Sequence, residues 1–258
     1  MIEEQVIPNN SLKRKGRATL AVSYHEDHTT APTLLFCPGY RSDMQGTKAM
    51  MLYEYAKTRE LSCLRFDYSG HGLSTGNYEE GTISSWTQDA LDVIDAYAKG
   101  PLVIVGSSMG GWIALNIALT RPEIIKALIL IAPAPDFTRY FFHERLNAEQ
   151  RGHLDTQGYV KIPNSYSDEP YHVRKAFIED GARHCLLDRK IAVRCPIRIL
   201  HGQQDESVPW QHSLTLTEKL ESNDVRLTFV KTGDHSLSTP QDLALLSTAL
   251  EDVMMLSK

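Results

Sequence analysis

Residues 102–112 read LVIVGSSMGGW, and this stretch decides the fold. The apolar run Leu102–Val105 is typical of a strand that is covered on both faces of a sheet. Over Trp112–Leu119 the chain is apolar almost all round a helix, so we expect a buried helix there. Between strand and helix, Gly106–Gly110 fits the pattern G-x-S-x-G with Ser108 at its centre. The sequence therefore predicts a sharp turn from a buried strand into a buried helix.

Ser108 is the candidate nucleophile at this turn. A serine in so sharp a turn takes a strained backbone conformation, and the turn lifts its hydroxyl above the sheet at the N-terminus of a helix. Gly106 and Gly110 remove side chains that would collide where the strand and the helix approach each other. Ser107 is a rival serine, but it lacks glycines at that spacing. The alternative interpretation is a glycine-rich turn without chemistry.

Two later loops supply a base and an acid for this serine. A serine hydroxyl needs a base, and the base needs a third group that orients it. In this type of fold the acid and then the histidine follow the serine along the chain. Asp205 follows the apolar run Ile197–Leu200, and His235 follows the alternating run Val225–Val230, so both are expected at the carboxyl ends of strands. We therefore predict Ser108, Asp205 and His235 as a catalytic triad.

Backbone donors at the end of another strand would complete the site. The predicted strand Thr33–Cys37 is followed by Pro38-Gly39-Tyr40. The backbone N–H of Tyr40 and that of Met109, directly after the serine, are expected to point at the substrate oxygen as it becomes negative. These two groups form the predicted oxyanion hole.

Other polar residues near the strand ends compete for roles in the site. Glu206 and Asp234 are alternatives for the acid. The loop Asp67–Ser74 contains His71, which we interpret as structural or as lining the substrate site, and not as the base. Arg41, one residue after the predicted oxyanion donor, is hypothesised to lie near the mouth of the site and to meet an acidic leaving group.

Apolar runs alternate with helical patterns along the rest of the chain. A helix is predicted around Trp86–Tyr97, with Ser85 and Gln88 as a capping box. The last helix is predicted to start near Thr239-Pro240. Its predicted buried residues are Leu243, Leu246, Leu250 and Val253. The strand candidates are Thr33–Cys37, Cys63–Phe66, Leu102–Val105, Ala127–Ile131, Ile197–Leu200 and, nearer an edge, Val225–Val230. Strands that alternate with helices imply a mostly parallel, doubly wound α/β sheet.

One segment breaks the alternation. Between Asp136 and Asp188 aromatic and charged residues are mixed, and no buried strand is predicted. Helical stretches are expected around Phe141–Gln150 and Tyr171–Arg183. We predict a single domain over residues 1–258 with a helical lid inserted at about residues 136–190. The alternative is two ordinary surface helices.

Composition limits the classes of partner. The chain has 27 basic and 32 acidic residues and a net charge of −5, which argues against a nucleic-acid partner. The dense basic cluster at residues 13–17 is interpreted as a solvated turn before a strand. The longest apolar run, Ala127–Ala132, is far shorter than the roughly 20 residues of a membrane span. The four cysteines are widely spaced, with no CxxC pair to support a zinc site.

Several further segments carry a resemblance to a known family. They are Pro38-Gly39-Tyr40, Gly46–Ala49, Arg65–Gly70, Gly106–Trp112, His184–Leu187, Cys195–Arg198 and Val208-Pro209-Trp210. With them the chain resembles the α/β-hydrolase superfamily over nearly its whole length. More narrowly, it resembles the group that contains mycophenolic acid acyl-glucuronide esterase, also described as an acyl-protein thioesterase.

The resemblance implies an activity and a site. It implies hydrolysis of a carboxylic ester or thioester of a small acyl compound through an acyl-enzyme intermediate. Ser108, Asp205 and His235 would be the triad, and no metal or organic cofactor is needed. The chain departs from the group in the charged segment Arg41-Ser42-Asp43 and in showing no evident mitochondrial presequence. We therefore expect a cytoplasmic enzyme.

Other functions stay open at this point. A ligand-binding protein that has kept the hydrolase scaffold without catalysis is one alternative. A C–C bond hydrolase or a peptidase is another, within the hydrolases. An epoxide hydrolase or dehalogenase is disfavoured, because those reactions require a carboxylate where Ser108 stands.

Overall fold

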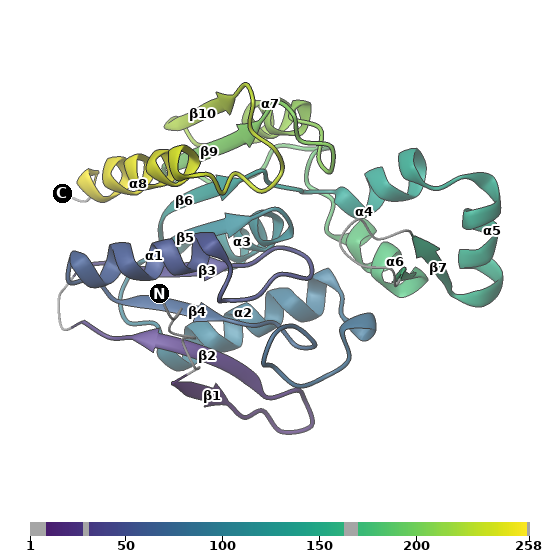
Figure 1. The fold of residues 1–258 in the computed structure, drawn as a ribbon, viewed down its shortest axis with the longest axis horizontal. Coiled ribbons are helices and arrows are strands. Elements are labelled where there is room, and N and C mark those ends of the chain that lie inside the picture. The colour runs from purple at the N-terminus through teal and green to yellow at the C-terminus, as the bar shows by residue number, and fades with distance from the viewer. Residues whose placement is uncertain (1–8, 28–30, 163–169, 257–258) are drawn as a thin grey trace.

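The apolar runs of the sequence form one eight-stranded sheet in the computed structural model, which describes residues 9–27, 31–162 and 170–256 (Figure 1). The strand order is β1-β2-β4-β3-β5-β6-β9-β10. From β4 to β10 all neighbouring strands are parallel, whereas β1 and β2 are antiparallel to their neighbours. The strands are β1 (Asn10–Leu12), β2 (Leu20–His25), β3 (Thr33–Cys37), β4 (Cys63–Phe66), β5 (Leu102–Ser107), β6 (Ile125–Ile131), β9 (Ile197–Gly202) and β10 (Val225–Val230). The predicted mostly parallel α/β sheet is confirmed.

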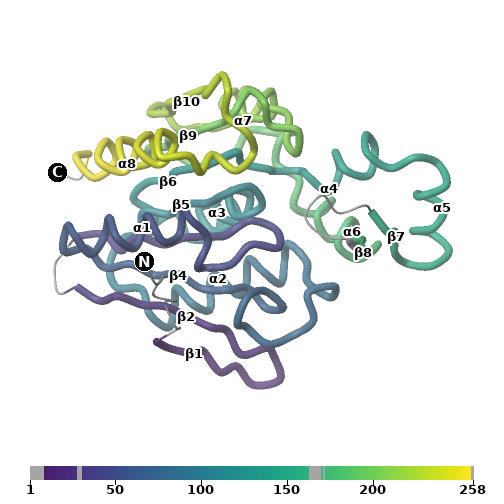
Figure 2. The backbone as a smooth tube through the Cα atoms, in the orientation of Figure 1, coloured from purple at the N-terminus to yellow at the C-terminus, as the bar shows by residue number. Residues whose placement is uncertain are grey.

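Helices cover both faces of the sheet. The helices against it are α1 (Thr47–Thr58), α2 (Ile83–Tyr97), α3 (Met109–Thr120), α7 (Gln211–Lys219) and α8 (Pro240–Met255). Side chains alternate along β5: Leu102 and Ile104 pack with α2 and α3, and Val103 and Val105 pack with α1 and α8. The helices α1 and α8 come from distant parts of the chain and pack side by side (Figure 2). The unbroken apolar run of β5 therefore reflects burial on both faces.

The N-terminal part of the chain differs from the sequence-based expectations. Strand β1 was not predicted, and β2 was expected only as a strand of unstated bounds after the basic cluster. The basic cluster does lie in a turn before a strand, but it is not simply solvated, because Arg14 and Arg17 form ion pairs with Asp89 and Asp92 of α2. The side chain of Arg14 is only 8% exposed.

Two predicted helix details need correction. The capping box of α2 is formed by Thr82 and Ser85, one turn earlier than the predicted pair Ser85 and Gln88. The last helix does begin at Pro240 after the capping residue Thr239. Of its four predicted core residues, Leu243 is only half-buried, because it lies beside the sheet-facing stripe.

Residues between β6 and β9 form an excursion from the sheet. Figure 1 shows α4, α5, α6 and β7 standing to one side of the sheet. The excursion contains α4 (Phe137–Tyr140), a π-helical turn (Phe141–Arg145), α5 (Ala148–Gln157), the antiparallel pair β7 (Tyr159–Ile162) and β8 (Tyr171–Arg174), and α6 (Lys175–Arg183). No buried strand was predicted here, and the two strands found are only partly buried, with Val160 and Val173 as their buried residues. The hairpin itself was not predicted. The two predicted helices are also shorter or shifted: the helical residues of the first region extend to Gln157, and the first four residues of the second predicted helix, Tyr171–Arg174, form β8 instead.

The remaining short elements are 3₁₀ turns at Tyr78–Glu80 and Pro122–Ile124. Among the helices within the described ranges, none combines the length and the apolarity that crossing a bilayer requires.

Candidate active site

Ser108 stands between β5 and α3 in a strained conformation. Its φ of 54° and ψ of −119° lie in a region that residues with a side chain rarely adopt. Backbone hydrogen bonds hold it there: the N–H of Ser108 donates to Ile131, and the N–H of Ala134 donates to the carbonyl of Ser108. The surrounding chain thus fixes a conformation that a free turn would avoid.

The close approach of the strand and the helix explains the flanking glycines. A Cβ on Gly106 would lie 2.4 Å from the carbonyl oxygen of Gly110. A Cβ on Gly110 would lie 2.0 Å from the carbonyl oxygen of Cys37. Both contacts are to backbone atoms, which cannot turn aside, so the turn requires glycine at both positions.

Gly110→Ala is expected to lower the free energy of unfolding by about 3 kcal/mol, the upper part of the range for overpacked sites. Chemical denaturation measures the loss. Gly152→Ala in α5 is the matched control, because its Cβ would meet nothing within 4 Å. That control is expected to be neutral or to stabilise the protein by up to about 1 kcal/mol. Equal stability of the two variants would contradict this account of the turn.

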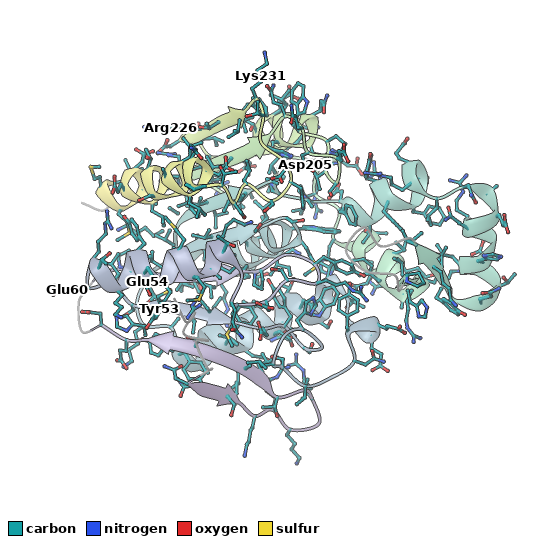
Figure 3. The ribbon with its side chains drawn as sticks, in the orientation of Figure 1. Tyr53, Glu54, Glu60, Asp205, Arg226 and Lys231 are labelled. Carbon is teal, nitrogen blue, oxygen red and sulfur yellow. The ribbon has the colours of Figure 1, made fainter. Side chains whose placement is uncertain are left out.

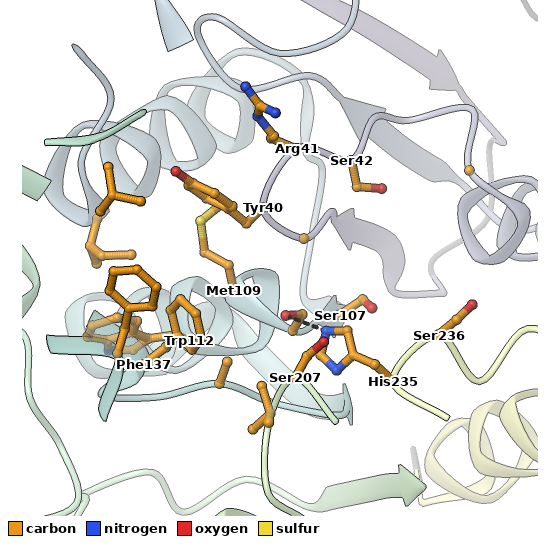
Figure 4. A pocket seen from close by; sticks show the side chains of 18 of the residues that line it. Tyr40, Arg41, Ser42, Ser107, Met109, Trp112, Phe137, Ser207, His235 and Ser236 are labelled. Carbon is orange, nitrogen blue, oxygen red and sulfur yellow. Dashed lines mark hydrogen bonds between the residues drawn. The ribbon is translucent and has the colours of Figure 1, made fainter. Parts of the chain in front are cut away.

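A chain of hydrogen bonds joins the three residues predicted as the triad, and Figure 4 shows the bond at His235 on the cavity side. The Nε2 of His235 lies 3.0 Å from the Oγ of Ser108, and its Nδ1 lies 2.7 Å from the Oδ2 of Asp205. Because an ionised carboxylate only accepts hydrogen bonds, Nδ1 carries the proton and Nε2 is free to accept the serine hydroxyl. This tautomer is the one in which the imidazole can act as a base towards Ser108.

Asp205 lies in the loop after β9, as Figure 3 shows, and its carboxylate is surrounded by donors. Its Oδ1 accepts hydrogen bonds from the backbone N–H groups of Ser207 and Val208, each 2.8 Å long. Burial alone would raise the pKa of Asp205, but hydrogen bonds from His201 and His235 outweigh it and hold the pKa well below its usual range. Asp205 is therefore ionised at neutral pH.

His201 is a residue of this site that we did not predict. It is fully buried in β9, where its Nε2 lies 3.1 Å from Asp205 Oδ2 and 3.1 Å from the carbonyl oxygen of Val208. Its Nδ1 lies 2.7 Å from the Oγ of Ser213. Because Nε2 faces two acceptors, it must donate, and the Ser213 hydroxyl donates to Nδ1. A histidine at the end of the apolar run Ile199–Leu200, four residues before the acid, was the available sign of this role.

The alternative acids do not face His235 in this way. The Oδ1 of Asp234 accepts the backbone N–H groups of Ser236 and Leu237. Glu206 is exposed. The Nδ1 of His235 donates its hydrogen bond to Asp205 instead.

A cavity of about 930 Å³ opens above Ser108. The backbone segment at Gly39 and Tyr40 and the start of α3 at Met109 border it. A Cβ on Gly39 would lie 3.4 Å from the Cβ of Ser108, so this loop passes directly beside the serine. The large apolar side chains along one part of the cavity are Trp112, Phe137, Phe141, Ile162, Val173 and Phe177. Most of them come from the excursion between β6 and β9.

The loop that carries Tyr40 is fixed from below by a buried carboxylate. Asp67 accepts the backbone N–H of Met44 through Oδ1, at 2.7 Å, and that of Leu73 through Oδ2, at 2.8 Å. The loop that borders the cavity and the loop of Leu73 are therefore tied to one side chain at the end of β4.

His71 lies beneath this loop, as the structural interpretation expects. It is 4% exposed, packs edge-on against Trp86 and Tyr78, and its Nε2 accepts the backbone N–H of Arg41 at 3.3 Å. The guanidinium of Arg41 lies 4.8 Å from the centre of the Tyr78 ring. Arg41 borders the cavity, as hypothesised, but Figure 4 shows its guanidinium directed away from His235.

His71 is expected to make the stability depend on pH. Burial lowers the pKa of His71 to about 4, against about 6.5 in an unfolded chain. Between these values the unfolded state binds more protons, so the free energy of unfolding falls as the pH drops from 6.5 to 4, by about 3 kcal/mol. Chemical denaturation across this pH range measures the change in the free energy of unfolding, with His71→Gln as the comparison. Identical pH slopes for the two proteins would refute the assignment.

The sheet, the strained serine after β5 and the cavity above it define an α/β hydrolase. Residues 28–184 match the family model described as serine aminopeptidase, S33, and the chain belongs to this family. It is 40% identical over 234 residues to the human protein named palmitoyl-protein thioesterase ABHD10, mitochondrial, covering 90% of this chain and 76% of the relative.

Two solved structures agree with this assignment. Mouse α/β hydrolase domain-containing protein 10 superposes with a TM-score of 0.89 at 38% identity, covering 96% of this chain and 99% of the other. A putative hydrolase from Agrobacterium vitis superposes with a TM-score of 0.90 at 38% identity, covering 95% and 97%. The α/β-hydrolase fold expected from the sequence is confirmed.

Proposed function

We propose that the protein hydrolyses carboxylic esters or thioesters of small acyl compounds, with Ser108 as nucleophile, His235 as base and Asp205 as the acid that orients the base. The observation that carries the proposal is the hydrogen-bonded chain from Ser108 through His235 to Asp205, open to a cavity with a large apolar wall. The backbone N–H groups of Tyr40 and Met109 are the proposed oxyanion hole.

The first half of the reaction forms an acyl-enzyme. His235 Nε2 takes the hydroxyl proton as the Oγ of Ser108 attacks the acyl carbon, and the carbonyl oxygen becomes an oxyanion held by the two backbone N–H groups. The C–S or C–O bond then breaks. His235 returns its proton to the leaving sulfur or oxygen, which departs as a thiol or an alcohol, and Ser108 stays acylated.

The second half releases the acid. His235 takes a proton from a water molecule as that water attacks the acyl carbon. The bond between the acyl group and Ser108 breaks, and the proton passes to the Oγ of Ser108. The products are a carboxylic acid and the free enzyme, so no cofactor is consumed.

The names of the relatives favour ester or thioester bonds over peptide bonds. The family description names an aminopeptidase, whereas the human relative at 40% identity is named a palmitoyl-protein thioesterase. The apolar side of the cavity supports the same choice, because burial of an acyl chain there removes apolar surface from water.

We also propose that residues 136–190 form a lid within a single α/β-hydrolase domain. The support is that Phe137, Phe141, Val173 and Phe177 of this segment border the cavity above Ser108. Residues 163–169 of the proposed lid lie outside the described residues.

The cytoplasmic location stays a prediction. The human relative is mitochondrial by name. Cell fractionation followed by immunodetection of the full-length protein tests the location, and recovery with mitochondria would refute it.

A labelling experiment followed by a substrate panel tests the proposed activity. The protein is expected to react with a fluorophosphonate, and peptide mass spectrometry is expected to locate the adduct on Ser108. A competitive panel of S-acyl thioesters of varied chain length, acyl glucuronides and simple esters then ranks substrates by kcat/KM. Absence of both labelling and turnover would favour a non-catalytic ligand-binding protein instead.

A further inference from the structure

The position of His235 decides on which side of Ser108 the leaving group lies. In the proposed reaction His235 hands a proton to the leaving atom, so that atom must lie within hydrogen-bond reach of Nε2. Figure 4 shows Ser236 on one side of His235, and Trp112 and Phe137 on the other side. The acyl chain therefore runs towards the apolar residues, and the leaving group runs towards Ser236.

The leaving-group side of the cavity is polar and positively charged. Ser42, Thr47, Lys48, Ser236 and Ser238 border it. Among the described residues that border the cavity there is no carboxylate. An anionic group bound on this side would therefore meet donors and a cation without a facing negative charge.

Lys48 is placed to supply that positive charge. It lies in the first turn of α1, and its Nζ donates to the carbonyl oxygen of Ser236 and to the Oγ of Ser238. An ammonium has three N–H groups, so one remains for a ligand in the cavity. Burial lowers the pKa of Lys48, and the carboxylates of Asp234 and Asp242, which lie outside the cavity lining, oppose this shift in part.

Two arginines, Arg41 and Arg145, also border the cavity, but their side chains contact other groups. The guanidinium of Arg41 is directed away from His235 and packs over Tyr78. Arg145, in the segment between β6 and β9, donates to the carbonyl oxygen of Glu206. Lys48 is thus the cation on the side to which His235 delivers the proton.

We propose that Lys48 binds an anionic group, a carboxylate or a phosphate, carried by the leaving thiol or alcohol of the substrate. This inference rests on the proposed hydrolase function and narrows its substrate class. The preferred substrates combine an apolar acyl chain, held by the aromatic side of the cavity, with a negatively charged leaving group. A charge-assisted hydrogen bond to Lys48 distinguishes them from uncharged esters and thioesters of the same acid.

Matched thioesters test the proposal. Octanoyl thioesters of N-acetylcysteamine, 3-mercaptopropionate and coenzyme A share one acyl group, and only the first leaving group is uncharged. Lys48→Met is expected to lower the ratio of kcat/KM for the charged over the uncharged substrates about tenfold, as for the loss of one charge-assisted hydrogen bond. Lys48→Arg is expected to retain most of the ratio, because it keeps the charge.

Lys57→Met is the matched control. It removes the same charge from the exposed last turn of the same helix, so the ratio is expected to stay at the wild-type value. An unchanged ratio in Lys48→Met overturns the proposal. An equal loss on all three substrates also overturns it, since Lys48 would then only hold the loop of Ser236.

The two charged substrates distinguish the two anions. If Lys48→Met lowers the kcat/KM ratio for the 3-mercaptopropionate thioester alone, the bound anion is a carboxylate. If it lowers the ratio for the coenzyme A thioester alone, the bound anion is a phosphate. Either result supports the proposal. If the wild-type protein hydrolyses none of the three thioesters and resists fluorophosphonate, the proposed function fails instead.

Discussion

Ser108→Ala is expected to lower kcat by a factor on the order of 10⁶ on every ester or thioester that the wild-type protein hydrolyses. Without the hydroxyl there is no atom to form the acyl-enzyme, and His235 has no proton to take. The backbone donors beside the serine remain, so slow residual hydrolysis above the rate in water is expected. Steady-state and single-turnover kinetics with an aryl ester measure the loss.

The fold should survive this change. Alanine removes only an oxygen that faces the cavity, and the backbone hydrogen bonds of residue 108 are kept, so the melting temperature is expected to stay near that of the wild type. Ser107→Ala is the control, because Ser107 is the neighbouring serine and is mostly buried at the end of β5. Loss of turnover in the Ser107 variant, with turnover kept in the Ser108 variant, would show that Ser107 and not Ser108 is the nucleophile.

The sequence predicts those parts of the fold that are buried on both faces. Continuous apolar runs such as Leu102–Val105 have no polar side to present to solvent, so they indicate central strands without further information. Strand β1 was missed, and the bounds of β2 were not predicted, because both lie towards an edge of the sheet, where burial depends on neighbours that the local sequence does not show. The hairpin of β7 and β8 was missed because its two short strands are separated by residues 163–170, so the local sequence does not show that they pair.

The residues of the candidate site also divide into those that the local sequence predicts and those whose role depends on the folded chain. The order of Ser108, Asp205 and His235 could be predicted because each residue comes directly after a recognisable strand. His201 could not be given a role in this way, because only the folded chain brings its ring between Asp205 and Ser213. The pairing of Arg14 with α2 likewise joins residues 75 positions apart, which no local pattern reports.

Asp205→Asn is expected to lower kcat/KM by about 10⁴, because it reverses the tautomer of His235. The carboxylate of Asp205 accepts four hydrogen bonds: two backbone N–H groups at Oδ1 and two imidazole N–H groups at Oδ2. An amide has only one oxygen, so its NH₂ group must face one of these pairs of donors. Since the backbone donors cannot change, the NH₂ group is expected to face the two histidines.

That arrangement pushes the proton of His235 from Nδ1 to Nε2, where it blocks acceptance of the Ser108 proton. The same NH₂ group also faces His201 Nε2, which must keep its proton for the carbonyl oxygen of Val208. One donor is therefore left without an acceptor, and the free energy of unfolding is expected to fall by about 1–3 kcal/mol. Glu206→Gln, a change to the exposed neighbouring acid, is expected to alter neither quantity. Wild-type kinetics in Asp205→Asn, or a large loss in Glu206→Gln, would show that another carboxylate orients the base.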